Sequence, residues 1–156
     1  MMHKKHSRPW TPLPYILILL ILIPNSISAA TLKMVPTKTT SSFQLTLEID
    51  KVEKLAGLKI SLTYPDKILQ FKTAAKTKAT SSFMHVVNDK NPGKLIIVMA
   101  SAKGISGSNV GLFNLDFKII ENSSTSSVSI DMTTCQLMTE DLKELSCDTI
   151  LYEVKL

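Results

Sequence analysis

Two cysteines are the residues of this 156-residue chain whose type and spacing most directly suggest chemistry. Cys135 and Cys147 enclose a segment that is symmetric about Asp141, so an antiparallel hairpin would place Leu137 opposite Leu145 and the cysteines opposite each other. Directly opposed strand residues can lie within disulfide reach. The spacing therefore predicts a disulfide, and the alternative is two buried thiols packed as small apolar side chains. A redox motif would need Cys-x-x-Cys, which is absent.

Side chains suited to catalysis or metal binding are sparse elsewhere. His85 is the only histidine after residue 30, and a lone strand histidine is usually structural or exposed. The sequence has no nucleophile elbow, zinc-ligand spacing or close carboxylate pair. Four acidic residues near the cysteine hairpin lack the EF-hand pattern of a calcium site, namely Glu140, Asp141, Glu144 and Asp148. We therefore expect no enzymatic activity, no cofactor and no metal site.

Residues 1–30 predict a secretory signal peptide. Lys4, Lys5 and Arg8 precede the apolar run 13–23, and small residues follow it at 26–30. The apolar run has about 11 residues, short of the roughly 20 that a helix needs to span a bilayer. An uncleaved signal anchor is the alternative. We expect the remaining chain to be secreted, or to reside in a periplasm or at a cell surface, where disulfides persist.

Loss of this leader removes most of the positive charge. The full chain has 18 Lys and Arg against 13 Asp and Glu. Three of the basic residues and none of the acidic ones lie in the leader, which leaves 15 against 13, a net charge of +2. Nucleic-acid binding requires a stronger basic balance, so we expect no nucleic-acid partner.

Apolar and polar side chains alternate through much of the chain after residue 30. This period of two is typical of strands with one buried face. The alternating segments are 43–49, 58–63, 113–119 and 128–132, and shorter strands are expected at 31–35, 83–87 and 150–156. The run 94–101 is apolar on both faces, as in a strand covered on two sides.

Proline and polar residues mark the predicted breaks. Pro65 cannot donate to a strand ladder, so the strand ends at a Tyr64-Pro65-Asp66 corner. Connectors are expected at 51–55, 72–82 and 103–111, with a turn at 88–93. The pattern predicts one all-β domain over residues 31–156, a two-sheet β-sandwich of about nine strands without long helices.

The order of these segments resembles the cohesin domain, the partner-binding module of cellulosome scaffolds. Three motifs support the resemblance: the corner strand with its Ile-Leu return at 60–69, the Lys-Leu-Ile-Ile-Val strand and Gly-containing loop at 94–111, and the Gly-Leu-Phe strand at 111–119. The resemblance covers residues 31–156. It implies a jelly-roll sandwich and non-catalytic binding of a dockerin-like helical partner.

The resemblance also implies which residues bind. It places the binding face on outward positions of the strands at 56–63, 83–87 and 94–101, which match Gly57, Lys59, Met84, Val86 and Met99. Many dockerin binders have Asn and Asp on the corner strand, where this chain has Gly57 and Lys59. The expected face is therefore flat and apolar with one cation, suited to a dockerin-like or other envelope protein.

A carbohydrate-binding module on the same fold is the alternative function. Sugar platforms need flat aromatic rings on an exposed face. After residue 30 the chain has no Trp, only Tyr64 and Tyr152, and five Phe that mostly fall at inward positions. We therefore expect a polysaccharide partner less than a protein partner.

Overall fold

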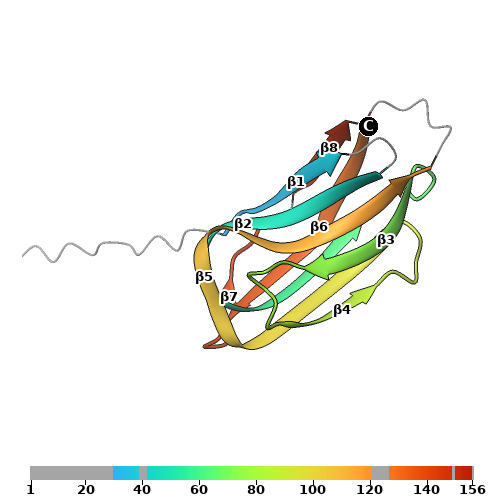
Figure 1. The fold of residues 1–156 in the computed structure, drawn as a ribbon. Coiled ribbons are helices and arrows are strands. Elements are labelled where there is room, and N and C mark those ends of the chain that lie inside the picture. Colours follow the sequence, from blue (N-terminus) through green and yellow to red (C-terminus); the bar gives the residue numbers. More distant parts are fainter. Residues whose placement is uncertain (1–29, 39–41, 121–126, 149, 156) are drawn as a thin grey trace, which may run out of the picture.

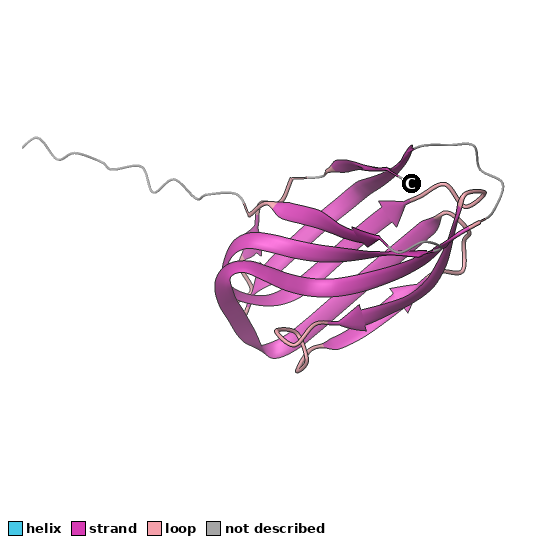
Figure 2. Ribbon diagram, turned by 45° about the horizontal axis from the view of Figure 1, so that its top comes forward, coloured by secondary structure: helices cyan, strands magenta, loops and turns pink. Residues whose placement is uncertain are grey.

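The computed structural model describes residues 30–38, 42–120, 127–148 and 150–155. This part of the chain contains strands and no helix (Figures 1 and 2), and hence no helix able to cross a membrane. The predicted signal peptide lies outside the described residues except for Ala30. The strands are β1 (Leu32–Lys38), β2 (Ser42–Thr63), β3 (Leu69–Lys76), β4 (Met84–Asn88), β5 (Lys94–Ile119), β6 (Ser127–Thr139), β7 (Glu144–Leu145) and β8 (Leu151–Lys155).

The strands form two facing layers that share β2 and β5. The first half of β2 and the last half of β5 lie in one layer, in the order β1-β2-β5-β3. Their other halves lie in the second layer, in the order β4-β5-β2-β6, with β7 and β8 along the far edge of β6. Figure 2 shows the long strands curving from one layer into the other. The predicted all-β sandwich is confirmed.

Two of the predicted connectors are bends inside these long strands. Residues 51–55 belong to β2 and residues 103–111 to β5, and both strands bend together while remaining paired. Lys54 (φ 56°) and Asn109 (φ 51°) adopt left-handed backbone conformations at the bends. At these two places the turn-forming residues mark a change of layer and not the end of a strand. Segments expected as separate strands are therefore joined in β2 and in β5, and the described chain has eight strands rather than about nine.

The third predicted connector, 72–82, is partly strand. β3 continues to Lys76, which pairs with Phe113 of β5. The polar and small residues of this segment give little apolar alternation, so its pairing was not visible in the sequence. A register shift between Phe71 and Thr73 further obscures the alternation.

The core lies between the two layers and consists of the alternating apolar side chains. Phe117 contacts three other aromatic rings: its ring stacks on Phe43 at 5.1 Å between centroids and meets Tyr64 and Phe71 edge-on at 5.2 and 5.7 Å. Such aromatic pairs each add about 1 kcal/mol beyond the area they bury. The predicted corner residue Tyr64 is thus part of the core.

The Tyr64-Pro65 corner is held by backbone hydrogen bonds. The N–H of Tyr64 donates to the carbonyl of Gly93 at 2.9 Å, and the N–H groups of Ile68 and Leu69 donate to the carbonyl of Pro65 at 3.0 and 2.9 Å. Gly93 has a φ of 77°, which glycine adopts without strain. The predicted corner and the turn before β5 therefore support each other.

The predicted cysteine hairpin is present. Leu137 of β6 pairs with Leu145 of β7, and Cys135 forms a disulfide with Cys147 with 5.8 Å between their Cα atoms. The hairpin also contacts the start of the domain, because the N–H of Ala30 donates to the carbonyl of Ser146 at 3.1 Å. This contact joins the two layers beside β1.

Candidate functional site

The outward positions of four neighbouring strands form one face of the second layer. β4, β5 and β2, the three strands expected to form the binding face, lie side by side, and β6 adds a fourth. The strand register aligns the outward residues in two rows across the sheet. We call these eight residues the outer face: Val86, Val98, Lys59 and Gln136 in one row, and Met84, Ala100, Gly57 and Met138 in the other.

The outer face is mostly apolar and exposed. The exposed fractions are 78% for Met84, 67% for Val86, 42% for Met138 and 41% for Val98. Contiguous exposed apolar side chains of this kind are typical of protein–protein contact sites. Methionine adapts its shape to different partners because its side chain is unbranched and flexible.

Met99 does not belong to this face, and its predicted outward position was wrong. Its side chain is 2% exposed and lies in the core with Leu95 and Ile97. Val98 takes the outward position instead, opposite Lys59. The error has a simple cause: the segment 94–101 is apolar on both faces, so its alternation does not show which residues point inward.

A hollow of about 360 Å³ lies at Gly57 on the outer face. The hollow is lined by Gly57 together with Lys59, Val98, Met138 and the acidic Glu144 of β7. A Cβ atom at Gly57 would lie 3.3 Å from the Cβ of Met138, tighter than an ordinary contact. Lys59 is exposed beside the hollow and is the one charged residue of the outer face.

Two of the four acidic residues near the cysteine hairpin, Glu140 and Asp141, form ion pairs with Lys54. Lys54 Nζ lies 3.3 Å from Glu140 Oε1 and 3.6 Å from Asp141 Oδ2. The backbone N–H of Gly104 and the Lys54 ammonium lower the pKa of Glu140, and Glu140 and Asp141 raise the pKa of Lys54. No group of three His, Cys, Asp or Glu side chains is placed to hold a metal in the described parts of the chain.

His85 has a packing contact rather than a catalytic neighbourhood. Its ring meets the buried ring of Phe113 edge-on, with centroids 5.2 Å apart. His85 borders a hollow together with Lys72, Thr73 and Asp89. Within the described residues, no hydrogen bond joins the Thr73 or Asp89 side chain to His85.

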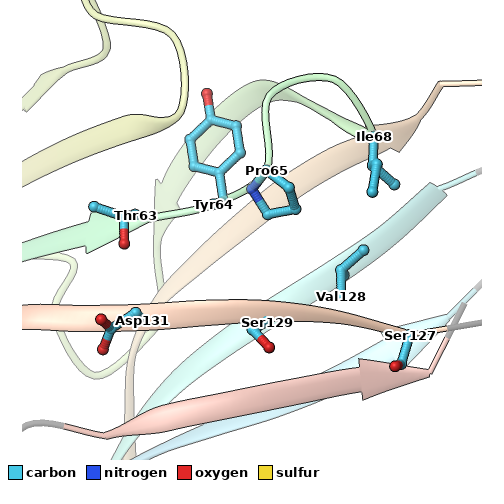
Figure 3. Close-up of a pocket in the computed structure, with 8 residues that line it drawn as sticks. All are labelled: Thr63, Tyr64, Pro65, Ile68, Ser127, Val128, Ser129 and Asp131. Atoms are coloured by element: carbon cyan, nitrogen blue, oxygen red, sulfur yellow. The ribbon is translucent and has the colours of Figure 1, made fainter. Parts of the chain in front are cut away.

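A second hollow, of about 440 Å³, lies at the Tyr64-Pro65 corner. Figure 3 shows its walls: Pro65 and Ile68 on one side, and the β6 residues Ser129 and Asp131 on the other. The Tyr64 ring points away from the β6 wall (Figure 3) and is only 9% exposed. No Phe, Tyr or Trp of the described chain is among the exposed large apolar residues, so the aromatic platform of a sugar-binding site is not present there.

Comparison with known protein families gives the class of the molecule. The family model for the cohesin domain matches residues 28–155. The chain belongs to the cohesin family. Cohesin domains are non-catalytic binding modules, so this cohesin is not an enzyme. No curated protein matches the sequence.

Solved cohesin structures share the fold at low sequence identity. The cohesin module of a family 33 glycoside hydrolase from Clostridium perfringens is 15% identical with a TM-score of 0.69, and the match covers 81% of this chain and 96% of that one. The sixth cohesin of Acetivibrio cellulolyticus scaffoldin B, solved with a Cel5 dockerin, is 15% identical with a TM-score of 0.68 and coverages of 82% and 97%.

A third similar structure is a non-cellulosomal cohesin from Archaeoglobus fulgidus. It is 15% identical with a TM-score of 0.64, and the match covers 82% of this chain and 91% of that one. Both scaffold-borne and non-cellulosomal cohesins are therefore similar to this chain, and the fold alone does not assign it to either group.

The structure adds four residues to the face that sequence reasoning did not place. They are Val98, Ala100, Gln136 and Met138. Val98 and Ala100 join the face because these residues of β5, and not Met99, point outward. Gln136 and Met138 depend on the pairing of β6 with β2, which brings together segments about 80 residues apart in the chain and for which the alternation of single strands carries no signal.

Proposed function

We propose that this cohesin is exported and binds a dockerin-like or other envelope or surface protein through the outer face of β4, β5, β2 and β6. The observation that carries the proposal is the exposed apolar surface of Met84, Val86, Val98 and Met138 around the Gly57 hollow. Similar cohesins have been solved in complex with dockerins, including the A. cellulolyticus module with a Cel5 dockerin.

Export is supported by two features. Residues 1–30 have the basic start, apolar run and small-residue end of a signal peptide. The Cys135–Cys147 disulfide suits an oxidising compartment. A surface or envelope partner would meet the domain there.

The composition of the outer face specifies the contacts the partner must make. A mostly apolar surface with a hollow favours an apolar side chain from the partner that fills the space above Gly57. Lys59, beside the hollow, would pair with a carboxylate of the partner, since an ammonium facing an apolar contact would lose its hydration without compensation.

The test measures binding of the purified domain to each dockerin module encoded in the same genome, by biolayer interferometry. Val98→Glu and Lys59→Glu are each expected to raise the dissociation constant about tenfold or more, which corresponds to about 1.4 kcal/mol of binding free energy. Lys118→Glu is the matched control, because Lys118 is an exposed strand lysine in the other layer. Equal affinity of Lys59→Glu and Lys118→Glu would contradict the proposed binding face. Absence of binding by every dockerin would rule out a dockerin partner and leave another envelope or surface protein.

A further inference from the structure

β4 differs from the other edge strands of the described chain in having no protection against pairing. Edge strands usually carry charges, proline or bulges that block the approach of another strand. β1 has Lys33 and Pro36, β3 has Lys72 and a bulge after Phe71, β7 is two residues long and contains Glu144, and β8 has Glu153 and Lys155. β4, with the sequence Met-His-Val-Val-Asn, has none of these devices.

β4 is also accessible. It pairs with β5 along one side only, and it lies at the margin of the second layer (Figure 1). Met84, His85 and Val86 are exposed, so side chains on both faces of the strand are open to solvent. An uncharged, exposed edge strand is a template for another strand, because its outer backbone groups lack ladder partners.

The sequence of β4 suits pairing with itself. In an antiparallel pair, directly opposed side chains point to the same face of the sheet. A two-fold axis relating two copies of β4 must therefore lie between the two copies of one residue, so that this residue faces itself. With the axis at Val86, all five residues of β4 are paired: Val86 faces Val86 of the second copy, His85 faces Val87, and Met84 faces Asn88. A symmetric contact of this kind closes as a dimer and does not propagate.

The charges that flank β4 are complementary in this arrangement. The register that places Val86 on the axis places Asp89 of one copy opposite Phe83 of the other. The Phe83 carbonyl accepts a hydrogen bond from the Lys76 ammonium at 2.7 Å. Each exposed Asp89 carboxylate therefore comes beside a Lys76 ammonium of the other copy, and symmetry makes this pair twice.

We infer that two copies of this chain associate through β4, in an antiparallel edge-to-edge pair centred on Val86. The second layers of the two copies then form one continuous sheet. The outer faces of both copies remain open and lie next to each other, so one dimer presents two adjacent binding faces. The inference does not depend on the proposed dockerin binding, because it rests on the unpaired backbone edge of β4, although Met84 and Val86 also belong to the outer face.

Sedimentation velocity over a range of concentrations tests the association. The wild-type protein is expected to change from the monomer mass to twice that mass as the concentration rises. Val86→Lys should remain monomeric at every concentration, since it would place two ammonium groups face to face on the axis. Val98→Lys is the matched control: it adds the same charge to the same face on the neighbouring central strand, and it is expected to dimerise like the wild type. Thermal melts of both variants confirm folding.

A cysteine cross-link tests the register. Directly opposed strand residues have Cβ atoms about 5 Å apart, so Val86→Cys should form a disulfide-linked dimer under mild oxidation and Val98→Cys should not. Asp89→Lys should weaken the wild-type dimer severalfold. A wild-type protein that stays monomeric at every concentration overturns the inference, as does equal cross-linking of the two cysteine variants. Loss of dimerisation in Val98→Lys would show association through the outer face instead and would also overturn it.

Discussion

The backbone N–H of Gly104 donates to Oε2 of Glu140 at 3.0 Å, and this bond joins the bend of β5 to the turn after β6. The same carboxylate pairs with Lys54 at the bend of β2, and the Glu140 N–H donates to the Lys54 carbonyl at 2.9 Å. Glu140 therefore connects both long strands at the point where they change layer. This end of the sandwich depends on a few specific contacts.

Gly104→Ala is expected to destabilise the domain by about 2 kcal/mol, in the range of overpacked core positions. An added Cβ would lie only 2.6 Å from the Cα of Lys54, so one of the two bends must shift. Gly111→Ala is the control, because its Cβ would be 3.4 Å from the nearest atom, Thr77 Cγ2, which is an ordinary contact. Urea denaturation measures both changes, and equal free energies of unfolding for the two variants would contradict the prediction.

Glu140 should make the stability of the protein sensitive to acid. Its pKa is lowered from 4.5, first by the Gly104 N–H and then by Lys54. A carboxyl group with a lowered folded pKa stabilises the protein above its unfolded pKa, and this contribution is lost as the pH falls through the folded pKa. We expect the melting temperature to decline below about pH 4.5 and to decline less in Glu140→Gln.

The control for this pH dependence is Glu53→Gln, an exposed substitution near the same bend. It should leave the acid-induced decline as in the wild type. Thermal melts at a series of pH values from neutral to strongly acidic give the comparison. If the melting temperatures of the wild type and of Glu140→Gln declined in parallel with falling pH, the contacts of Glu140 with Gly104 and Lys54 would not contribute to the acid sensitivity.

Removal of the disulfide should cost about 3 kcal/mol in the chain-entropy model, given the 12-residue separation of the cysteines. Cys147→Ser and the double variant with Cys135→Ser are expected to lose the same amount, because either removes the cross-link. Denaturant unfolding with and without reductant measures the loss. Unchanged stability of the double variant, or a wild-type mass that shows two free thiols, would contradict this prediction.

In β5 the side chain of Met99 points into the core and that of Val98 points outward, which predicts effects of different size on stability for these two neighbouring residues. Met99→Ala should destabilise the domain by about 3 kcal/mol, since it leaves a cavity in the core. Val98→Ala should change stability by only about 0.5 kcal/mol because the side chain is on the surface. Chemical denaturation of both variants decides which of the two side chains points inward. A larger loss for Val98→Ala would restore the outward position of Met99.

The predicted signal peptide and the packing of Ala30 together predict the cleavage site. Ala30 is 6% exposed and its N–H donates to the Ser146 carbonyl, so this residue packs with the folded strands. This packing revises the boundary of 1–30 predicted from the sequence: we expect the signal peptidase to cut before Ala30, so that the mature chain retains it. Intact mass of the exported protein gives the new N-terminus, and a mature chain starting beyond Ala30 would contradict the prediction.

The sequence by itself determined the alternating strand segments, the Tyr64-Pro65 corner and the Cys135–Cys147 pair, but not the strand residues at 51–55, 72–76 and 103–111. These features are local: alternation has a period of two residues, proline acts on its neighbours, and the hairpin symmetry lies within a dozen residues. The cohesin resemblance also followed from ordered local motifs. No pairing over long distances was needed for any of these predictions.

Only the tertiary structure decided which side of a strand faces outward and which strands are neighbours. In 94–101 both faces are apolar, so Met99 and Val98 could be distinguished only by packing against the other layer. Met138 joined the outer face because β6 pairs with β2. The layer change of β2 and β5 likewise depends on Gly104 and Glu140, which are separated by 36 residues. Contacts between distant segments depend on the shape and register of the whole sheet, which local alternation does not encode.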